Sequence, residues 1–347
     1  MRCLTLADAL RAQGAECLFV CRPRAGDLLE RIAARGHRVL ALPELSRTAT
    51  AVCPDGPHHA DWLGIDWDQD ASETCHRLER EDLHWLVVDH YAIDYRWQRR
   101  LRAACGRLMV IDDLADRGHD CDLLLDQSLG RTRADYENLV SPGTPMLLGP
   151  QFALLRPEFS QLRSESLARR AEPALGRLLI TMGGVDKDNA TGDVLAALDS
   201  CPLPEELRIS VVLGPNSPYL GDIQNRAAYM RRPTEVLVGV PNMARLMTES
   251  DLAIGAAGGT SWERCCLGLP SFVLTIADNQ YVVAESLQNA GAAIAAHSAE
   301  EITQNLQARL SSGEITYFLA ELSGAAARIT DGCGASRVVE RMIDDYD

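Results

Sequence analysis

Leu252-Ala253-Ile254-Gly255-Ala256-Ala257-Gly258-Gly259-Thr260-Ser261-Trp262-Glu263 runs from a short apolar segment through a glycine turn into a helix-forming segment. This order is typical of a βα unit in a parallel sheet. A second stretch of the same kind lies at residues 177–191, where an apolar strand precedes Met182-Gly183-Gly184-Val185-Asp186 and a helix. Two such units in one half of the chain predict a doubly wound α/β domain with both glycine turns at carboxyl ends of strands.

The same alternation of short apolar runs and helix-period segments continues along the chain, whose 347 residues allow two cores. Ten strands are expected, at residues 16–20, 38–42, 85–89, 107–111, 123–126, 177–181, 208–213, 235–239, 252–255 and 271–274. We therefore predict an α/β protein with a domain at 1–150, a linker at 151–174, a second domain at 175–330 and a terminal helix at 331–347.

Four further segments have recognisable patterns. Apolar residues at helical spacing from Leu4 to Leu10, followed by Gly14, predict a helix, although a doubly wound domain usually opens with a strand. The polar residues 48–72 predict a long surface loop, and residues 159–170 a polar helix within the linker. The apolar stripe at 335–346 predicts a helix able to pack back on the first domain.

Composition excludes several classes of function. With 34 Lys and Arg against 49 Asp and Glu, the net charge of −15 repels a nucleic-acid backbone. No run of about 20 apolar residues or signal peptide is visible, so we expect a cytoplasmic protein that does not insert into membranes. The 11 cysteines form no C-x-x-C pair, which predicts buried thiols and neither a metal site nor a cofactor held by cysteine.

The glycine turn at 258–261 has the chemistry of a phosphate site. Glycines let a phosphate approach the main chain, Thr260 and Ser261 carry hydroxyl donors, and Glu263 can accept from both hydroxyls of a ribose. A plain turn with a helix cap is the alternative. Neither turn fits the P-loop or the dinucleotide-binding pattern, which disfavours ATP hydrolysis and hydride transfer.

In the first half, polar side chains follow two apolar strands. Asp89, His90 and Tyr91 come after one of them. Asp112 and Asp113 follow the next, where capping of the loop is the simpler role. Asp89 and Tyr91 are the better candidates for positioning a sugar hydroxyl, and His90 is expected to be a surface histidine.

Taken together, these segments resemble the UDP-2,4-diacetamido-2,4,6-trideoxy-β-L-altropyranose hydrolases of pseudaminic acid biosynthesis. The resemblance covers nearly the whole chain and is carried by residues 1–7, 87–94, 111–115, 121–127, 149–159, 182–186, 256–263 and 277–280. It implies a GT-B-like architecture, two doubly wound domains facing a cleft. It also implies attack of water on the anomeric carbon of a UDP-sugar, with no cofactor.

The resemblance also implies site residues. It places the UDP diphosphate at Gly258, Gly259, Thr260 and Ser261, the ribose at Glu263 and the uracil near Val240, Asn242 and Met243. Catalytic roles fall to Asp89, Tyr91 and Asn279, and substrate contacts to Gln280 and to Gly183, Gly184 and Asp186 of the turn at 182–186. The only partner expected is the small-molecule UDP-sugar.

The chain departs from that family at its start. The family's catalytic base is a histidine in a Gly-x-Gly-His turn just ahead of the Met-Arg-Cys-Leu helix, and here the sequence opens at Met1. We therefore expect the first strand to be missing, through a misassigned start codon, and hydrolysis by this chain to be weak or absent. The alternatives are a GT-B sugar transferase and a nucleotide-sugar binding protein without turnover.

Overall fold

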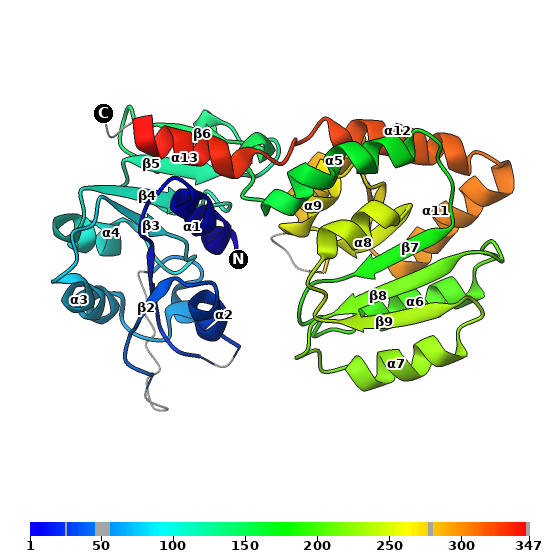
Figure 1. Ribbon diagram of the computed structural model, residues 1–347, viewed down its shortest axis with the longest axis horizontal. Helices are drawn as coiled ribbons and strands as arrows, with labels where there is room; N and C mark the ends of the chain where they lie inside the picture. The colour runs from blue at the N-terminus through cyan, green and yellow to red at the C-terminus, as the bar shows by residue number, and fades with distance from the viewer. Residues whose placement is uncertain (25, 46–55, 277–279, 345–347) are drawn as a thin grey trace. The chain divides into compact units, whose positions relative to one another are not determined.

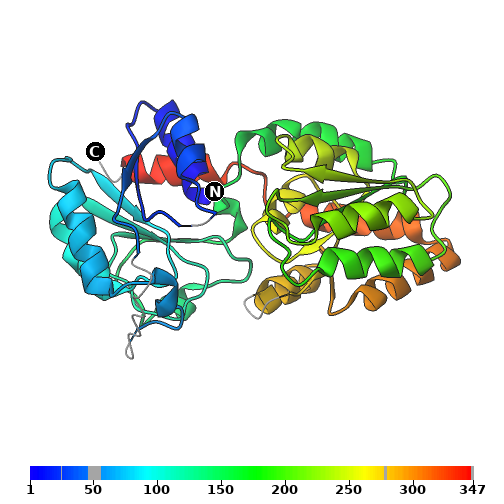
Figure 2. The same ribbon diagram turned by 90° about the horizontal axis from the view of Figure 1, so that it is seen from below.

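The structure is a computed structural model that describes residues 1–24, 26–45, 56–276 and 280–344. It divides into two compact units, and Figures 1 and 2 show both as parallel sheets covered by helices. Unit 1 consists of Met1–Leu154 with Ala335–Asp347, and unit 2 of Leu155–Gly334. Among the described residues, no helix combines the length and the apolar character needed to cross a bilayer.

The described residues of unit 1 form six parallel strands in two sheets. The strands are β1 (Leu18–Cys21), β2 (Arg38–Ala41), β3 (Trp85–Val88), β4 (Arg107–Ile111), β5 (Leu123–Asp126) and β6 (Met146–Leu148). One sheet has the order β3-β4-β5-β6, whereas β1 and β2 pair only with each other among the described residues. The helices are α1 (Arg2–Ala12), α2 (Leu29–Ala34), α3 (Trp67–Leu78), α4 (Tyr95–Leu101) and α13 (Gly334–Asp344).

Alternation along the strands of unit 1 builds a core on each face of the larger sheet. On β4, Leu108 and Val110 pack in a cluster with Leu78 of α3 and Leu101 of α4. The intervening residues of β4 face the other way and pack with Leu6 of α1 and with α13. Because successive side chains of a strand point to opposite faces, a strand covered on both sides must be apolar along its buried length, as residues 108–111 of β4 and 123–125 of β5 are.

Unit 2 is a doubly wound domain around one six-stranded parallel sheet. Its strands are β7 (Arg177–Thr181), β8 (Arg208–Leu213), β9 (Thr234–Val238), β10 (Leu252–Ala256), β11 (Ser271–Leu274) and β12 (Ile294–Ala296). The order across the sheet is β12-β11-β10-β7-β8-β9. The chain therefore builds outward from β7 to β9 and then returns to the other side of β7 at β10.

Helices cover both faces of the sheet in unit 2 (Figure 1). They are α5 (Pro157–Arg170), α6 (Ala190–Ser200), α7 (Leu220–Tyr229), α8 (Met243–Glu249), α9 (Thr260–Cys266), α10 (Tyr281–Asn289), α11 (Ala299–Ser312) and α12 (Ile315–Ala327). Helix α6 packs beside α7 and α11, and α5 beside α8, α9 and α12. Apolar side chains of α6, α11 and α12 bury one face of the strands.

The ten predicted strands are all confirmed within two residues, and β6 and β12 were not predicted. The helix expected before Gly14 is α1, and Gly14 has the positive φ of +89° that a helix-ending glycine often adopts. The predicted loop at 48–72 is wrong in its second half, where a 3₁₀ turn, Ala60–Leu63, and α3 begin; Asp66 caps α3. Residues 46–55 lie outside the described residues.

The helix predicted at 159–170 is confirmed as α5, but the segment around it is not the exposed linker expected at 151–174, because residues from Leu155 onward belong to unit 2. Phe159 and Ser166 are fully buried. Arg170 is also buried, and its guanidinium donates to the carbonyl oxygens of Met247, Thr248 and Ser250 at the end of α8. The polar residues that made the segment look exposed therefore satisfy carbonyl groups that the ends of other helices leave unpaired.

Candidate functional site

The two glycine turns follow neighbouring strands of unit 2. The first turn, residues 182–186, follows β7, and the second turn, residues 257–260, follows β10. Gly255 of β10 pairs with Thr181, the last residue of β7, so both turns leave the sheet at the same edge. This edge is also where the strand order reverses direction, since β8 lies on one side of β7 and β10 on the other. Open α/β sheets bind ligands in the crevice at such a switch point, outside the carboxyl ends of the strands.

The main chain of both turns is uncovered. A methyl group placed on Gly184, Gly258 or Gly259 would meet no atom within 4 Å, leaving space for a ligand to reach the backbone. Gly183 has a φ of +99°, which favours glycine at this position. Gly214, after β8, packs directly on the carbonyl group of Gly184, so the loop after β8 supports the first turn from below.

The hydroxyl groups of the second turn lie over a buried arginine. Arg264, on α9, is 1% exposed. It donates to Ala256 O at 3.0 Å, Ser261 Oγ at 3.0 Å and Thr260 Oγ1 at 3.3 Å. Ser261 is itself 1% exposed and points inward, whereas Thr260 is partly exposed. Thr260 is therefore the hydroxyl that the surface of this turn presents.

Glu263 has a perturbed acidity. Its side chain is 18% exposed, and its Oε1 lies 3.8 Å from Arg156 Nη2, whose other nitrogen contacts Glu158 at 2.9 Å. Burial raises the pKa of Glu263 to about 7, against the opposing effect of Arg156 and Arg264. A carboxyl group with this pKa, one helical turn from the glycine loop, changes its charge near neutral pH.

Other predicted site residues hold the local loops in place. Asp186, after the first turn, accepts hydrogen bonds from Ala190 N and Thr191 N at 3.0 Å and so begins α6. Asn242 accepts from Arg245 N at 3.2 Å and caps α8, and Gln280 accepts from Ile276 N at 3.1 Å. These contacts occupy an oxygen of each side chain, and a ligand would compete for what remains.

The remaining predicted site residues of unit 2 are Val240, Met243 and Asn279. Val240 and Met243 are partly exposed on either side of Asn242, after the edge strand β9. Asn279, predicted to be catalytic, lies outside the described residues.

In unit 1, Asp89 and Tyr91 follow β3 and belong to a network of charges. Asp89 accepts from Arg2 Nη2 at 2.7 Å and Nε at 3.1 Å, and from the Cys3 thiol at 3.2 Å. Arg2 Nη1 also binds Asp113 at 2.8 Å, and Asp113 in turn binds the Tyr91 hydroxyl. The network joins α1 to the ends of β3 and β4.

Burial and the charges of this network shift the pKa values of Asp89 and Tyr91. Burial alone would raise the pKa of Asp89, but Arg2 outweighs it and holds that pKa below its ordinary value. Burial and Asp113 raise the pKa of Tyr91, so the phenol stays protonated. Asp89 is therefore a weak proton acceptor, and Tyr91 a hydrogen-bond donor.

Asp89→Asn is expected to lower the free energy of unfolding of the protein by about 1–3 kcal/mol at pH 7, because it weakens a partly buried ion pair. The stabilisation from a lowered carboxyl pKa is present above pH 4 and is lost as pH falls below it, so the difference should shrink at pH 3. Urea unfolding at both pH values measures it. Glu16→Gln, at a highly exposed ion pair, serves as the control and should change stability by less than about 0.5 kcal/mol. Equal stability of Asp89→Asn and the unaltered protein would contradict a structural role for the pair.

Aromatic rings gather around Tyr91. The rings of His59 and Trp62 lie 4.4 Å apart, and each has its centre 5.8 Å from that of Tyr91. Trp62 is 52% exposed, and Arg117 lies 5.9 Å from the Tyr91 ring. The sequence has no local sign of this cluster, because α3 separates His59 and Trp62 from Tyr91 along the chain.

Asp112 has the loop-capping role that the sequence favours, whereas His90 is not the surface histidine expected from the sequence. Asp112 is fully buried, accepts from Ala115 N at 2.9 Å and binds Arg117 at 2.9 Å. His90 is half-buried rather than on the surface, and its Nδ1 accepts from Ala92 N at 3.1 Å. Both side chains are used within the loops that follow β3 and β4.

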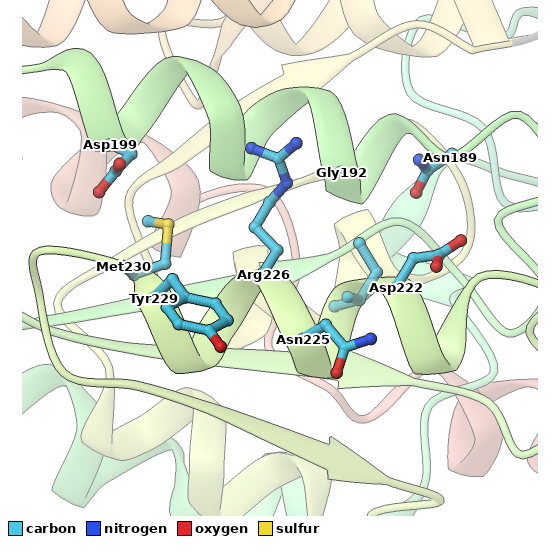
Figure 3. A pocket seen from close by; sticks show the side chains of 9 residues that line it. Asn189, Gly192, Asp199, Asp222, Asn225, Arg226, Tyr229 and Met230 are labelled. Carbon is cyan, nitrogen blue, oxygen red and sulfur yellow. The ribbon is translucent and has the colours of Figure 1, made fainter.

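A cavity of about 390 Å³ lies between α6 and α7 (Figure 3). Arg226 extends from α7 toward α6, and Asp199, Asp222 and Tyr229 are among the other lining residues. Sequence analysis named none of them. In the described part of the chain, no group of three or more His, Cys, Asp or Glu side chains is arranged to hold a metal ion.

Comparison of the fold identifies its class as GT-B. MurG of Acinetobacter baumannii matches with a TM-score of 0.70 and 14% identity, over 99% of this chain and 95% of that one. The calicheamicin glycosyltransferase CalG4 matches with a TM-score of 0.61 and 11% identity, over 99% of this chain and 94% of that one. At these identities the likeness establishes the two-domain α/β fold.

Two curated proteins are similar in sequence. The UDP-2,4-diacetamido-2,4,6-trideoxy-β-L-altropyranose hydrolase of Campylobacter jejuni is 26% identical over 185 residues, 53% of this chain and 64% of that protein. The spore coat polysaccharide biosynthesis protein SpsG of Bacillus subtilis is 29% identical over 173 residues, 49% of this chain and 50% of that protein. The matches thus span half to two thirds of each relative and are consistent with the resemblance described above. No family model matches the chain.

Proposed function

We propose that the chain is a nucleotide-sugar hydrolase that releases UDP from UDP-2,4-diacetamido-2,4,6-trideoxy-β-L-altropyranose. The observation that supports it best is the pair of uncovered glycine turns on adjacent strands, with Glu263 beside the second turn. The similarity to the Campylobacter jejuni hydrolase supports the choice of sugar. The free sugar would serve pseudaminic acid biosynthesis, in the cytoplasm.

Unit 2 would bind the UDP. In the proposed site the backbone of Gly258 and Gly259 and the Thr260 hydroxyl donate to the diphosphate, and ionised Glu263 accepts from the ribose hydroxyls. The first turn, with Gly183 and Gly184, closes the other side of the same edge. Uracil would lie near Val240, Asn242 and Met243, and the sugar near Gln280 and Asn279.

The reaction places few demands on the protein. Water attacks the anomeric carbon, the C1–O bond breaks with inversion, UDP leaves with the bonding electrons, and the attacking water loses one proton to the surrounding water. UDP is a good leaving group, so donors that stabilise its growing charge replace the general acid that glycosidases need. Because Arg2 holds Asp89 ionised and weakly basic, we assign Asp89 and Tyr91 to positioning rather than to proton removal.

Incubation of the protein with this UDP-sugar tests the proposal, with UDP-N-acetylglucosamine as the control substrate. The expected result is slow release of UDP and free sugar in equal amounts, because no residue of the described site is assigned to remove the proton of the attacking water. Inversion should be visible by proton NMR before the sugar mutarotates. Calorimetric binding of UDP without release of sugar would contradict hydrolysis and favour a nucleotide-sugar binding protein. Transfer of the sugar to an added alcohol in preference to water would favour the transferase.

A further inference from the structure

Arg264 is an unusual residue to find inside a domain core. It is 1% exposed, and among the described residues no carboxylate forms an ion pair with it. Its hydrogen-bond partners are a carbonyl and two hydroxyls, all of them neutral. Burying a cation without a counter-charge is unfavourable by several kcal/mol. The buried charge of Arg264 next to the 257–260 turn therefore requires an explanation.

The nearest acid compensates Arg264 only in part. Glu263 is the neighbouring residue on α9, and burial raises its pKa to about 7, so part of the population is uncharged at neutral pH. Arg156, another cation, lies 3.8 Å from the same carboxyl group and is itself paired with Glu158 at 2.9 Å, so two cations face one full and one partial negative charge. The region below the second glycine turn therefore holds more positive than negative charge.

The hydrogen bonds of Arg264 also fix which way the loop hydroxyl can donate. A guanidinium has no acceptor, so Thr260 Oγ1 must accept from Arg264 Nη1. The hydroxyl proton of Thr260, which is partly exposed, is then free to be donated away from the core. The bonds to Ala256 O and Ser261 Oγ hold both ends of the turn on the same side chain.

Space for the arginine is provided by a glycine. A methyl group on Gly255 would lie 2.5 Å from Arg264 Nη1 and 2.8 Å from Thr181 O. The guanidinium of Arg264 thus fills the space that a side chain at Gly255 of β10 would occupy.

We propose that Arg264 is the positioning residue of an anion site on the 257–260 turn, where it supplies the buried positive charge that selects a diphosphate and orients the Thr260 hydroxyl toward it. The inference deepens the proposed function and rests on it for the identity of the nucleotide. It predicts that Arg264 contributes to binding of the phosphates and not of the nucleoside.

Calorimetric titration of the protein with UDP, pyrophosphate and uridine tests this, on Arg264→Met and Arg264→Lys. Arg264→Met should weaken UDP and pyrophosphate binding 10- to 100-fold while changing uridine binding less than threefold. Arg264→Lys, which keeps the charge but cannot bind three oxygens in a fork, should lose 3- to 10-fold. Arg170→Met, which removes another buried arginine of unit 2, is the matched control and should leave UDP affinity within threefold.

A double-mutant cycle separates orientation from general stability. Thr260→Val should weaken UDP binding in the unaltered protein and have little further effect in the Arg264→Met background, because the hydroxyl has lost its orientation. If Arg264→Met does not fold, the same cycle in the Arg264→Lys background decides the question.

Several results would overturn the inference. Equal losses of UDP and uridine affinity, or no loss of either in Arg264→Met, would exclude a role in phosphate recognition. If the unaltered protein binds pyrophosphate but not UDP, the nucleotide assignment fails and the anion site stands. If it binds neither, both the proposed function and this inference fail.

Discussion

Replacing Glu263 by glutamine is expected to make the protein more stable at pH 8 and, at the same time, 10- to 100-fold weaker in binding UDP. The stability effect follows from the raised pKa of about 7 for this carboxyl group. Because the folded state holds the proton more tightly than the unfolded chain, the free energy of unfolding falls as pH rises from about 4.5 to 7. Glutamine has no charge to bury, and the gain should be about 1–3 kcal/mol at pH 8.

The binding effect has the opposite sign because a neutral amide is a weaker acceptor than a carboxylate for two ribose hydroxyls. UDP affinity should rise more steeply from pH 6 to pH 8 in the unaltered protein than in Glu263→Gln, where only ionisation of the terminal phosphate of UDP contributes. Thermal unfolding at pH 5 and pH 8, together with calorimetry at pH 6 and pH 8, measures both effects. At pH 5 the two proteins should unfold at nearly the same temperature.

Glu158→Gln is the matched control for Glu263→Gln, since Glu158 also contacts Arg156 but is more exposed. It should leave UDP affinity within threefold. A Glu263→Gln protein that is less stable at pH 8 would mean that the ion pair with Arg156 is structural. Unchanged UDP affinity would remove Glu263 from the ribose site. A gain in stability with a loss of binding is the behaviour expected of a site held in a strained charge state for its ligand.

Gly214→Ala is expected to disrupt the first glycine turn from a distance. The added methyl group would enter the van der Waals radius of the Gly184 carbonyl oxygen, and both partners are backbone atoms with little room to move. Overpacking of this kind costs about 1–3 kcal/mol of stability. The turn must shift to relieve it, so UDP affinity should fall more than tenfold.

Gly184→Ala is the control for Gly214→Ala. It adds a methyl group to the same pair of loops without a steric clash, because a methyl group at Gly184 meets no atom within 4 Å. Its melting temperature should stay within about 2 °C of the unaltered protein, since a change of 1 kcal/mol shifts a domain of this size by about 2–4 °C. Thermal unfolding and UDP titration of both variants give the comparison. A Gly214→Ala protein with unaltered melting temperature and UDP affinity would show that the loops after β7 and β8 do not act together.

Strand positions and glycine turns were accessible from the sequence because they depend on short-range patterns. A run such as Leu178 to Ile180 is apolar in a way that only a strand buried on both faces requires. The two missed strands, β6 and β12, have three residues each. They exist because a neighbouring strand offers its unpaired edge, and no local pattern of three residues signals that.

Some features of the candidate site are visible in the sequence, and others appear only in the folded structure. Glycines before a helix and the acid at Glu263 are visible in the sequence, because the backbone itself makes the turn. The inward direction of Ser261, the buried place of Arg264 and the ion pair of Arg2 with Asp89 were not visible. Each depends on how deeply a side chain is buried and on which charge lies beside it.

By itself, the sequence determined two parallel α/β domains and the location of two phosphate-compatible turns, since hydrophobic period and glycine placement act within a few residues along the chain. The tertiary structure alone decided that the turns share one edge, that α5 belongs to unit 2 and that Asp89 is held ionised by its ion pair with Arg2. Desolvation and Coulomb interactions between residues remote in sequence have no short-range signature, and they appear only when the chain has folded.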